Sequence, residues 1–135
     1  MTTKAEKMLQ DWRGAWNAHE VERILSYLTD DIVYEDLGGA RVMRGKAELR
    51  TWLNETFSAF PDFRVDLKSL FVSGKWAGDE WVTSGTLKGE LFHLKPTGKG
   101  YSVRGASIME LRGDKIRRNT DYYDSATVIK QVWLT

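Results

Sequence analysis

Residues 101–124 read YSVRGASIMELRGDKIRRNTDYYD, and this stretch decides the fold. Two segments of strand character, 101–111 and 115–123, flank a turn at 112–114 that contains a glycine and an aspartate. Two such segments on either side of a short glycine-containing turn indicate a β-hairpin. The stretch therefore predicts a long antiparallel hairpin in the last third of the chain.

Working outward from this hairpin, helical periodicity dominates the first half of the chain and strand patterns the second half. Apolar residues recur at helical spacing early in the chain, and they alternate with a period of two after Phe63. The predicted helices cover 4–17, 21–28, 46–59 and a short segment capped by Asp124 or Ser125; the predicted strands cover 32–34, 63–68 and 81–87, with a turn over 74–79.

Helices segregated from an antiparallel sheet make an α+β domain, predicted here as one unit over residues 1–135. Strands this long for a small chain should twist and curve strongly. We therefore predict a cone in which three helices from the N-terminal half cover the concave side of a mostly antiparallel sheet, followed by a short C-terminal helix. Such a cone leaves a conical cavity between the helices and the sheet.

The composition excludes several classes of protein. The net charge of +1 gives no field that would attract nucleic acid, and the absence of cysteine excludes disulfides and thiol catalysis. Two histidines, His19 and His93, are too few for a histidine-rich metal centre, so no metal site is predicted. Six tryptophans, five tyrosines and five phenylalanines indicate a dense aromatic core or an aromatic-lined cavity.

No targeting or membrane segment is evident. The first residues lack the apolar core of a secretory signal, and no apolar run approaches the roughly 20 residues that a membrane helix needs. We expect a cytoplasmic protein that has no membrane partner. Phosphate-binding, dinucleotide-binding, serine-hydrolase and zinc-peptidase motifs are also missing from the sequence.

The last strand carries the strongest candidate for chemistry. A period of two puts Arg117, Asn119, Asp121 and Tyr123 on one of its faces. A carboxylate in mid-strand among aromatic residues is expensive unless it is paired or solvated, and in an apolar cavity its pKa rises toward neutrality. Asp121 is therefore a candidate general acid or base, and the alternative is a structural pair with an arginine on a neighbouring strand.

Two further polar sets are candidates for ligand contact. Tyr34 and Asp36 share a strand face, where Tyr34 could donate a hydrogen bond to a ligand and Asp36 more readily begins an Asx turn. Arg104 and Ser107 fall on opposite faces of the next-to-last strand. Arg104 could stabilise an oxyanion or form a salt bridge between strands.

The remaining candidates are rings. Trp12, Trp16, Trp52 and Trp81 could line the cavity or fill the core, and His93 could act as a base or lie idle in a loop. His19, in a helix break, is expected to be structural. The outer sheet face should be apolar and covered by a second copy of the chain, with Phe71, Trp76 and Trp133 as candidates for this homodimer interface or for a protected edge.

Short stretches along nearly the whole chain resemble the SnoaL-like polyketide cyclase family, whose fold is that of the nuclear-transport-factor-2-like superfamily. They run in the family's order: 16–20 and 28–31, 44–49, 59–62, 80–89, 97–99, 103–105, 113–116 and 121–124.

This resemblance implies a cofactor-free enzyme. In the family's cyclases an aspartate at the position of Asp121 is the acid/base of an intramolecular aldol condensation that needs no metal or organic cofactor. Ser107 stands where such cyclases can carry a histidine. Related limonene epoxide hydrolases pair the last-strand aspartate with an arginine and a second aspartate on an earlier strand, and residues 81–83 contain neither.

The predicted function is therefore cofactor-free acid/base catalysis, an aldol cyclisation or an isomerisation, on a small hydrophobic or aromatic carbonyl compound. One alternative is a non-catalytic ligand-binding or dimerisation module, and another is an epoxide-hydrolase-like activity with an incomplete triad. The predicted site combines the catalytic Asp121 with nine substrate-binding residues: Trp12, Trp16, Tyr34, Trp52, Trp81, Arg104, Ser107, Asn119 and Tyr123.

Overall fold

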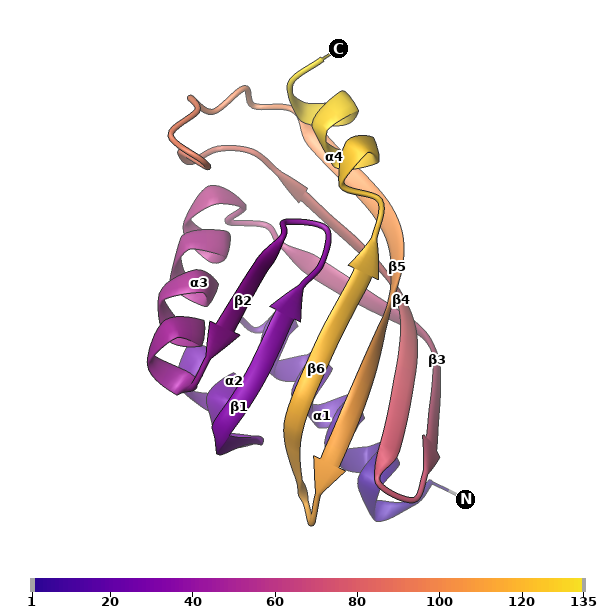
Figure 1. Ribbon diagram of the computed structural model, residues 1–135. Helices are drawn as coiled ribbons and strands as arrows, with labels where there is room; N and C mark the ends of the chain where they lie inside the picture. The colour runs from indigo at the N-terminus through magenta and orange to yellow at the C-terminus, as the bar shows by residue number, and fades with distance from the viewer. Residues whose placement is uncertain (1, 135) are drawn as a thin grey trace.

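A curved six-stranded sheet with helices packed on its concave side forms the body of the molecule (Figure 1). The computed structural model describes residues 2–134. In chain order its elements are α1 (Lys4–Asn17), α2 (Val21–Ser26), β1 (Leu28–Asp36), β2 (Arg41–Arg44), α3 (Lys46–Ala59), β3 (Arg64–Ser73), β4 (Trp76–Thr86), β5 (Gly100–Arg112), β6 (Lys115–Tyr123) and α4 (Ser125–Val132). The predicted α+β class and the predicted hairpin are confirmed.

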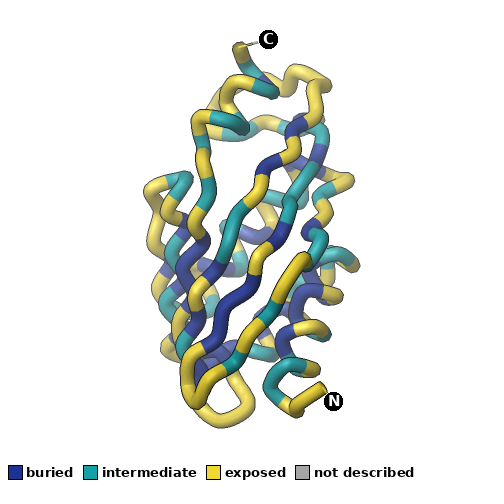
Figure 2. Tube along the Cα trace, turned by 90° about the vertical axis from the view of Figure 1, so that its right-hand side faces the viewer, coloured by how far each residue is buried: buried dark blue, intermediate teal, exposed yellow. Residues whose placement is uncertain are grey.

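The strand order across the sheet is β2-β1-β6-β5-β4-β3. Only β1 and β6 run parallel, and the other neighbours are antiparallel. The hairpin of β5 and β6 thus lies in the middle of the sheet, and β1 joins it from the N-terminal half. Along the strands buried and exposed residues tend to alternate, which marks one face as the inner one (Figure 2).

Helix α1 shows why the helices cover the inner face. The hydroxyl of Thr3 caps its first turn by accepting a hydrogen bond from the Glu6 backbone N–H at 3.1 Å. Leu9, Trp12 and Trp16 recur at helical spacing and are buried. This stripe binds the helix to the sheet, because each fully buried side chain of this size contributes roughly 1.5–3 kcal/mol.

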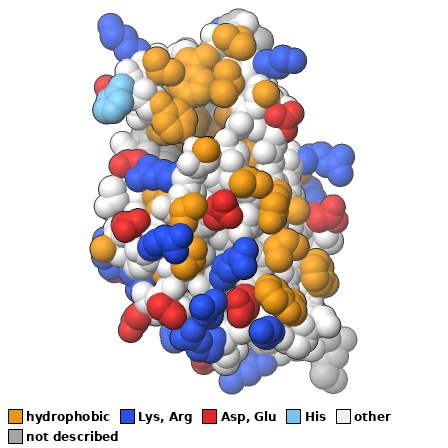
Figure 3. All heavy atoms as spheres, in the orientation of Figure 1, with side chains coloured by type: hydrophobic (Ala, Val, Ile, Leu, Met, Phe, Trp, Pro, Cys, Tyr) orange, Lys and Arg blue, Asp and Glu red, His pale blue; other side chains and the backbone are white. Residues whose placement is uncertain are grey.

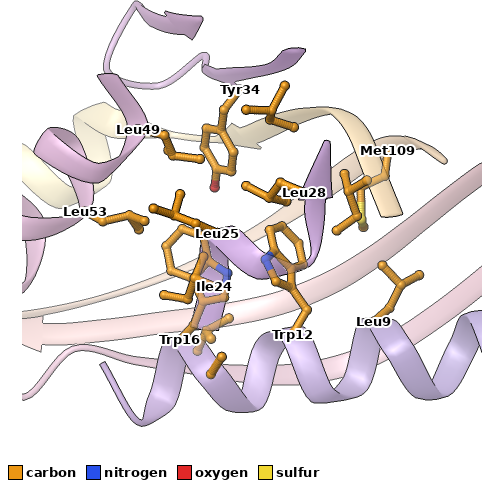
Figure 4. Packing of buried hydrophobic residues seen from close by; sticks show 14 of the residues in the cluster. Leu9, Trp12, Trp16, Ile24, Leu25, Leu28, Tyr34, Leu49, Leu53 and Met109 are labelled. Carbon is orange, nitrogen blue, oxygen red and sulfur yellow. The ribbon is translucent and has the colours of Figure 1, made fainter. Parts of the chain in front are cut away.

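The main core lies between the three N-terminal-half helices and the sheet. Figure 4 shows the aromatic and aliphatic side chains of the helices pointing toward those of the strands. The residues labelled there are Leu9, Trp12, Trp16, Ile24, Leu25, Leu28, Tyr34, Leu49, Leu53 and Met109. A smaller cluster around Phe60, Tyr101 and Val132 joins α4 to the far end of β5.

Several predicted elements have other bounds in the structure: the helix predicted over 21–28 ends at Ser26, and the strand predicted over 32–34 already begins at Leu28. The predicted turn over 74–79 is only two residues long, at Gly74 and Lys75, and Trp76 already begins β4. Gly74 has φ +59°, a conformation that glycine adopts without strain, so the chain reverses in less space than predicted. Strand β2 was not predicted, because its four residues are too few for a period-two pattern to stand out.

The outer sheet face carries exposed apolar side chains. Phe71, Trp76, Ile108 and Tyr122 are 42–55% exposed, and the first three come from the neighbouring strands β3, β4 and β5. Trp133, predicted with this group, instead packs in the cluster beside α4. Within residues 2–134 no helix has the length and hydrophobicity required to cross a membrane.

Candidate functional site

A row of polar side chains crosses the inner face of the sheet. Asp36 on β1 pairs in register with Asp121 on β6, Asp121 with Ser107 on β5, and Ser107 with Asp79 on β4. We call these four residues the polar row. All four are buried, with exposed fractions of 0–7%. Strand register therefore brings together polar groups from four segments of the chain beneath the helices.

Asp121 accepts three side-chain hydrogen bonds. Its Oδ1 accepts from the Ser107 hydroxyl at 2.6 Å and from the Asn119 amide at 2.8 Å. Its Oδ2 accepts from the Tyr34 hydroxyl. Burial raises the pKa of Asp121 above its usual value, although nearby Arg13 and the three hydrogen bonds favour the charged form. A carboxyl group so placed can exchange a proton closer to neutral pH than an exposed aspartate can.

Arg13, on α1, supplies the positive charge nearest to the polar row. Its Nε and Nη2 contact the two carboxylate oxygens of Asp79 at 2.8 and 3.1 Å. Nη2 also donates to the Ser107 hydroxyl at 3.0 Å, and the guanidinium lies 4.5 Å from the centre of the Trp12 ring. Arg13 thus neutralises Asp79 directly and acts on Asp121 through Ser107.

Arg13 and Asp79 were not predicted as site residues. A signal for Arg13 existed, since it shares a helix face with Leu9, Trp12 and Trp16. Asp79 was hidden by the turn predicted over 74–79. Neither Arg104 nor Arg117, arginines of the two hairpin strands, forms an ion pair with Asp121: Arg117 contacts Glu110 at 3.1 Å, and Arg104 is exposed.

A cavity of about 350 Å³ opens beside Asp121. Its wall is mainly aromatic and aliphatic, and the polar groups at it include Asp36, Tyr34 and Arg13. At the end of the molecule that carries α4, apolar side chains gather at the surface (Figure 3). Phe92 and Ile129 are exposed there and also line the cavity, so an apolar ligand would meet apolar side chains at its entrance.

Most of the predicted site residues are brought together around this cavity. Six of them line it: Trp16, Tyr34, Trp52, Trp81, Asp121 and Tyr123. Ser107 and Asn119 are fully buried behind Asp121 and contact its carboxylate. These two residues therefore contact Asp121 and do not line the cavity, whereas direct contact with a ligand was predicted for them.

Two predicted ligand contacts lie outside the cavity. Trp12 is fully buried in the core, where it packs edge-on against Trp16 at 5.7 Å between ring centres. Arg104 is exposed on the outer face, because strand alternation turns it away from Ser107. His93 is fully exposed. His19 contacts the Phe63 backbone carbonyl at 2.8 Å and stacks on Phe57, in keeping with the structural role predicted for it.

Asp36 combines two features of which only one was predicted. It accepts the Gly39 backbone N–H at 3.2 Å, which is the predicted Asx-turn bond. It also lines the cavity and shares a hydrogen bond with the Tyr123 hydroxyl. Burial raises the pKa of Asp36, and the nearby charge of Asp121 raises it further. The cavity therefore has two carboxyl groups whose pKa values lie above normal.

Metal ligands do not gather anywhere in the described part of the chain. Within residues 2–134 no group of three or more histidine, aspartate and glutamate side chains is arranged to hold a metal ion.

Comparison with known proteins gives the same fold. A family model described as SnoaL-like polyketide cyclase matches residues 6–132. No curated protein matches the chain in sequence.

Solved structures with this fold come from several bacteria. A protein of Xanthomonas campestris pv. campestris, provisionally described as a polyketide cyclase, is 22% identical with a TM-score of 0.87 over 96% of this chain and 97% of its own. A protein of the same description from Pseudomonas putida KT2440 is 22% identical, with a TM-score of 0.86 over 98% of each chain.

A third structure, from Catenulispora acidiphila, is described as having a ketosteroid isomerase-like fold and was solved in complex with trimethylamine. It is 22% identical, with a TM-score of 0.82 over 93% of this chain and 91% of its own. At these identities the structures bear on the fold alone, and they agree with the predicted cone.

Proposed function

The chain belongs to the SnoaL-like polyketide cyclase family, and from this premise we propose that it is a cofactor-free enzyme of the cyclase or isomerase kind with Asp121 as its acid/base. The substrate we propose is a flat, mostly apolar carbonyl compound. The observation that carries the proposal is a buried carboxyl group with a raised pKa at the wall of an aromatic cavity.

The proposed chemistry begins at a carbon next to the substrate carbonyl. The Asp121 carboxylate accepts a proton from that carbon, and the electron pair of the C–H bond moves into the carbonyl to give an enolate. In an isomerisation the proton returns to a different carbon. In a cyclisation the enolate carbon attacks a second carbonyl of the same molecule, and the resulting alkoxide takes the proton.

The surroundings of Asp121 suit both directions of this transfer. Three hydrogen bonds and Arg13 stabilise the carboxylate, while burial favours the neutral acid and raises the pKa of Asp121 overall. The aromatic wall would hold a flat substrate in a fixed orientation and keep water away from the enolate. Trp16, Trp52 and Trp81 offer the largest flat surfaces for this purpose.

The test uses Asp121→Asn on the full chain. As a probe we choose 2-tetralone, a two-ring ketone, and measure deuterium uptake from D₂O at its α-carbon by NMR. The exchange rate of the variant should be at least about 1,000-fold lower than that of the wild type. One acid/base group typically contributes about 100- to 10,000-fold to a rate. Its melting temperature should equal or exceed that of the wild type, since a buried charge is removed.

Asp114→Asn is the matched control. Asp114 lies in the exposed turn between β5 and β6, so this variant removes a carboxylate without touching the cavity. If Asp121→Asn exchanges deuterium as fast as Asp114→Asn, the acid/base assignment is wrong. Retained binding of the ketone without exchange in the wild type would favour the non-catalytic ligand-binding module.

The homodimer predicted from the sequence belongs to the same proposal. Phe71, Trp76, Ile108 and Tyr122 leave apolar area exposed on the outer sheet face, and a second copy of the chain would cover it. Sedimentation velocity at micromolar concentration should give a 31 kDa species, about twice the chain mass of 15.5 kDa. A single species of chain mass would exclude the dimer. The cytoplasmic location stays a prediction.

A further inference from the structure

The hydrogen bonds around Asp121 restrict where a proton can sit on it. We propose that Tyr34 is a catalytic residue that exchanges the proton with the substrate, while Asp121 stores this proton on Oδ2 behind it. The inference rests on the proposed function and changes one step of it: the proton passes between the substrate and Asp121 through the Tyr34 hydroxyl instead of directly. It follows from counting donors and acceptors at three side chains: Asp121, Ser107 and Tyr34.

The Ser107 hydroxyl can point its hydrogen in only one direction. Its oxygen receives N–H donors from Arg13 Nη2 at 3.0 Å and Trp81 Nε1 at 2.9 Å. Neither of these groups can accept a hydrogen bond, and together they occupy both lone pairs of the oxygen. The one hydrogen of Ser107 is therefore committed to its third neighbour, Oδ1 of Asp121.

Oδ1 of Asp121 is consequently closed to a proton. It accepts from Ser107 and also from the Asn119 amide at 2.8 Å. A proton on this oxygen would face the hydrogen of the Ser107 hydroxyl, which has no free direction in which to turn. The protonated form of Asp121 must then carry its hydrogen on the other oxygen, Oδ2.

Oδ2 has Tyr34 as its hydrogen-bond partner, and a phenol can both donate and accept. When Asp121 is charged, the Tyr34 hydroxyl donates to Oδ2. When Asp121 is neutral, Oδ2–H donates to the Tyr34 oxygen, and the phenolic hydrogen is released to another acceptor. Tyr34 lines the cavity, so that acceptor can be a bound substrate.

The Tyr34 ring is held in place while its hydroxyl turns. It lies 5.3 Å from the Trp52 ring and 6.0 Å from the Trp16 ring, measured between centres, and only 1% of the residue is exposed. Rotation of the O–H bond is thus the movement that the relay needs. A fixed ring with a rotating hydroxyl delivers a proton to one position in the cavity.

The transfer balances without any further reactant. In the donating direction the Tyr34 O–H bond breaks as the substrate oxygen or carbon takes its hydrogen, and the Tyr34 oxygen takes the hydrogen of Asp121 Oδ2. Asp121 ends as a carboxylate and Tyr34 as a neutral phenol. The abstracting direction is the reverse, so two protons move in each transfer.

One experiment locates the proton without any substrate. The infrared C=O stretch of protonated Asp121 is identified as the band lost in Asp121→Asn, in protein labelled with ¹³C at aspartate carboxyl carbons. If the proton sits on Oδ2, the C=O is Oδ1, and Ser107→Ala moves the band to higher wavenumber while Tyr34→Phe leaves it nearly in place. Ser107→Thr keeps the hydroxyl and the band position. The opposite pattern, with Tyr34→Phe moving the band and Ser107→Ala not, overturns the proposal.

The second experiment follows deuterium exchange into 2-tetralone. The exchange rate of Tyr34→Phe should be at least about 100-fold lower than that of the wild type. In mixtures of H₂O and D₂O, the wild-type rate plotted against the D₂O fraction should fall along a curve and not a straight line, as two moving protons require. Tyr27→Phe, at the end of α2 and outside the cavity, is the matched control. A Tyr34→Phe rate within tenfold of the wild type, together with a large loss in Asp121→Asn, would overturn the relay and leave the proposed function standing. Loss in neither variant would instead overturn the proposed function.

Discussion

Asp121 and Asp36 stand side by side on β6 and β1, in register and equally buried at 7% exposure, yet their surroundings differ. Asp121 accepts bonds from three side chains and lies one hydroxyl away from Arg13. Asp36 accepts one backbone N–H and shares a hydrogen bond with Tyr123. Strand register thus places two carboxyl groups at equivalent positions, and the residues around each one determine its chemical properties.

Arg13 lies near Asp121 and not near Asp36, and substitution of Arg13 should have the largest effect on stability of the changes considered. Arg13→Met leaves the Asp79 carboxylate buried without its partner, which should lower the free energy of unfolding by about 3–5 kcal/mol. Urea unfolding monitored by tryptophan fluorescence measures this. The same change should raise the pKa of Asp121 further, because Arg13 favours its charged form.

Two controls make this prediction specific. Arg112→Met breaks the exposed pair with Asp31 and should change the free energy of unfolding by at most about 1 kcal/mol. The double variant Arg13→Met, Asp79→Leu removes both charges and should recover much of the stability. An Arg13→Met variant as stable as Arg112→Met would mean that the ion pair with Asp79 does not support the polar row.

The second prediction concerns Asp36 and pH. Its folded-state pKa is raised by burial above the unfolded value of about 3.9, so the folded state holds the proton more tightly. The resulting stabilisation is fully present below about pH 4 and is lost as pH rises through the raised pKa. The asparagine side chain of the variant Asp36→Asn does not titrate. The unfolding free energy of this variant should therefore rise relative to that of the wild type as pH rises, by about 1.4 kcal/mol per unit of pKa shift.

Urea unfolding of both proteins at several pH values between 4 and 8 measures this gap. Asp114→Asn, which removes an exposed carboxylate, should show no such trend. A gap that narrows with rising pH would contradict the raised pKa. Deuterium exchange by Asp36→Asn should stay within about tenfold of the wild type, in contrast to Asp121→Asn.

The sequence predicts the inward-facing residues of the long strands better than it predicts the contacts around them. The hairpin of β5 and β6 is long enough for alternation to put Arg104 and Ser107 on opposite faces, as the structure has them. Arg104 was nevertheless predicted to contact the ligand, and it lies exposed on the outer face. Tyr34 and Asp36 follow from the same rule on β1. Alternation predicts which face of a strand a residue lies on and how residues on that face are spaced. It can therefore identify the inward-facing residues of long strands.

The remaining parts of the site depend on contacts between distant segments. Arg13 meets Asp79 across 66 positions of the chain, and no local pattern encodes that meeting. An arginine on an apolar helix stripe is a usable signal, but its partner becomes evident only once β4 is known to begin at Trp76. The double role of Asp36 is hidden likewise, because the Asx-turn bond alone already accounts for an aspartate before two glycines.

The smallest expected effect compares the two tyrosine–aspartate pairs directly. Tyr123→Phe removes the side-chain hydrogen bond of Asp36, as Tyr34→Phe does for Oδ2 of Asp121. Because Tyr123 is only partly buried, we expect a loss of about 0.5 kcal/mol in unfolding free energy, the low end for one hydrogen bond. The pKa of Asp36 should rise, since that bond favours its charged form. Deuterium exchange into 2-tetralone should change by no more than a few-fold, because in our proposal no proton passes through Tyr123. Equal losses in Tyr123→Phe and Tyr34→Phe would mean that the two carboxyl groups share the chemistry and that the extra donors around Asp121 do not distinguish it.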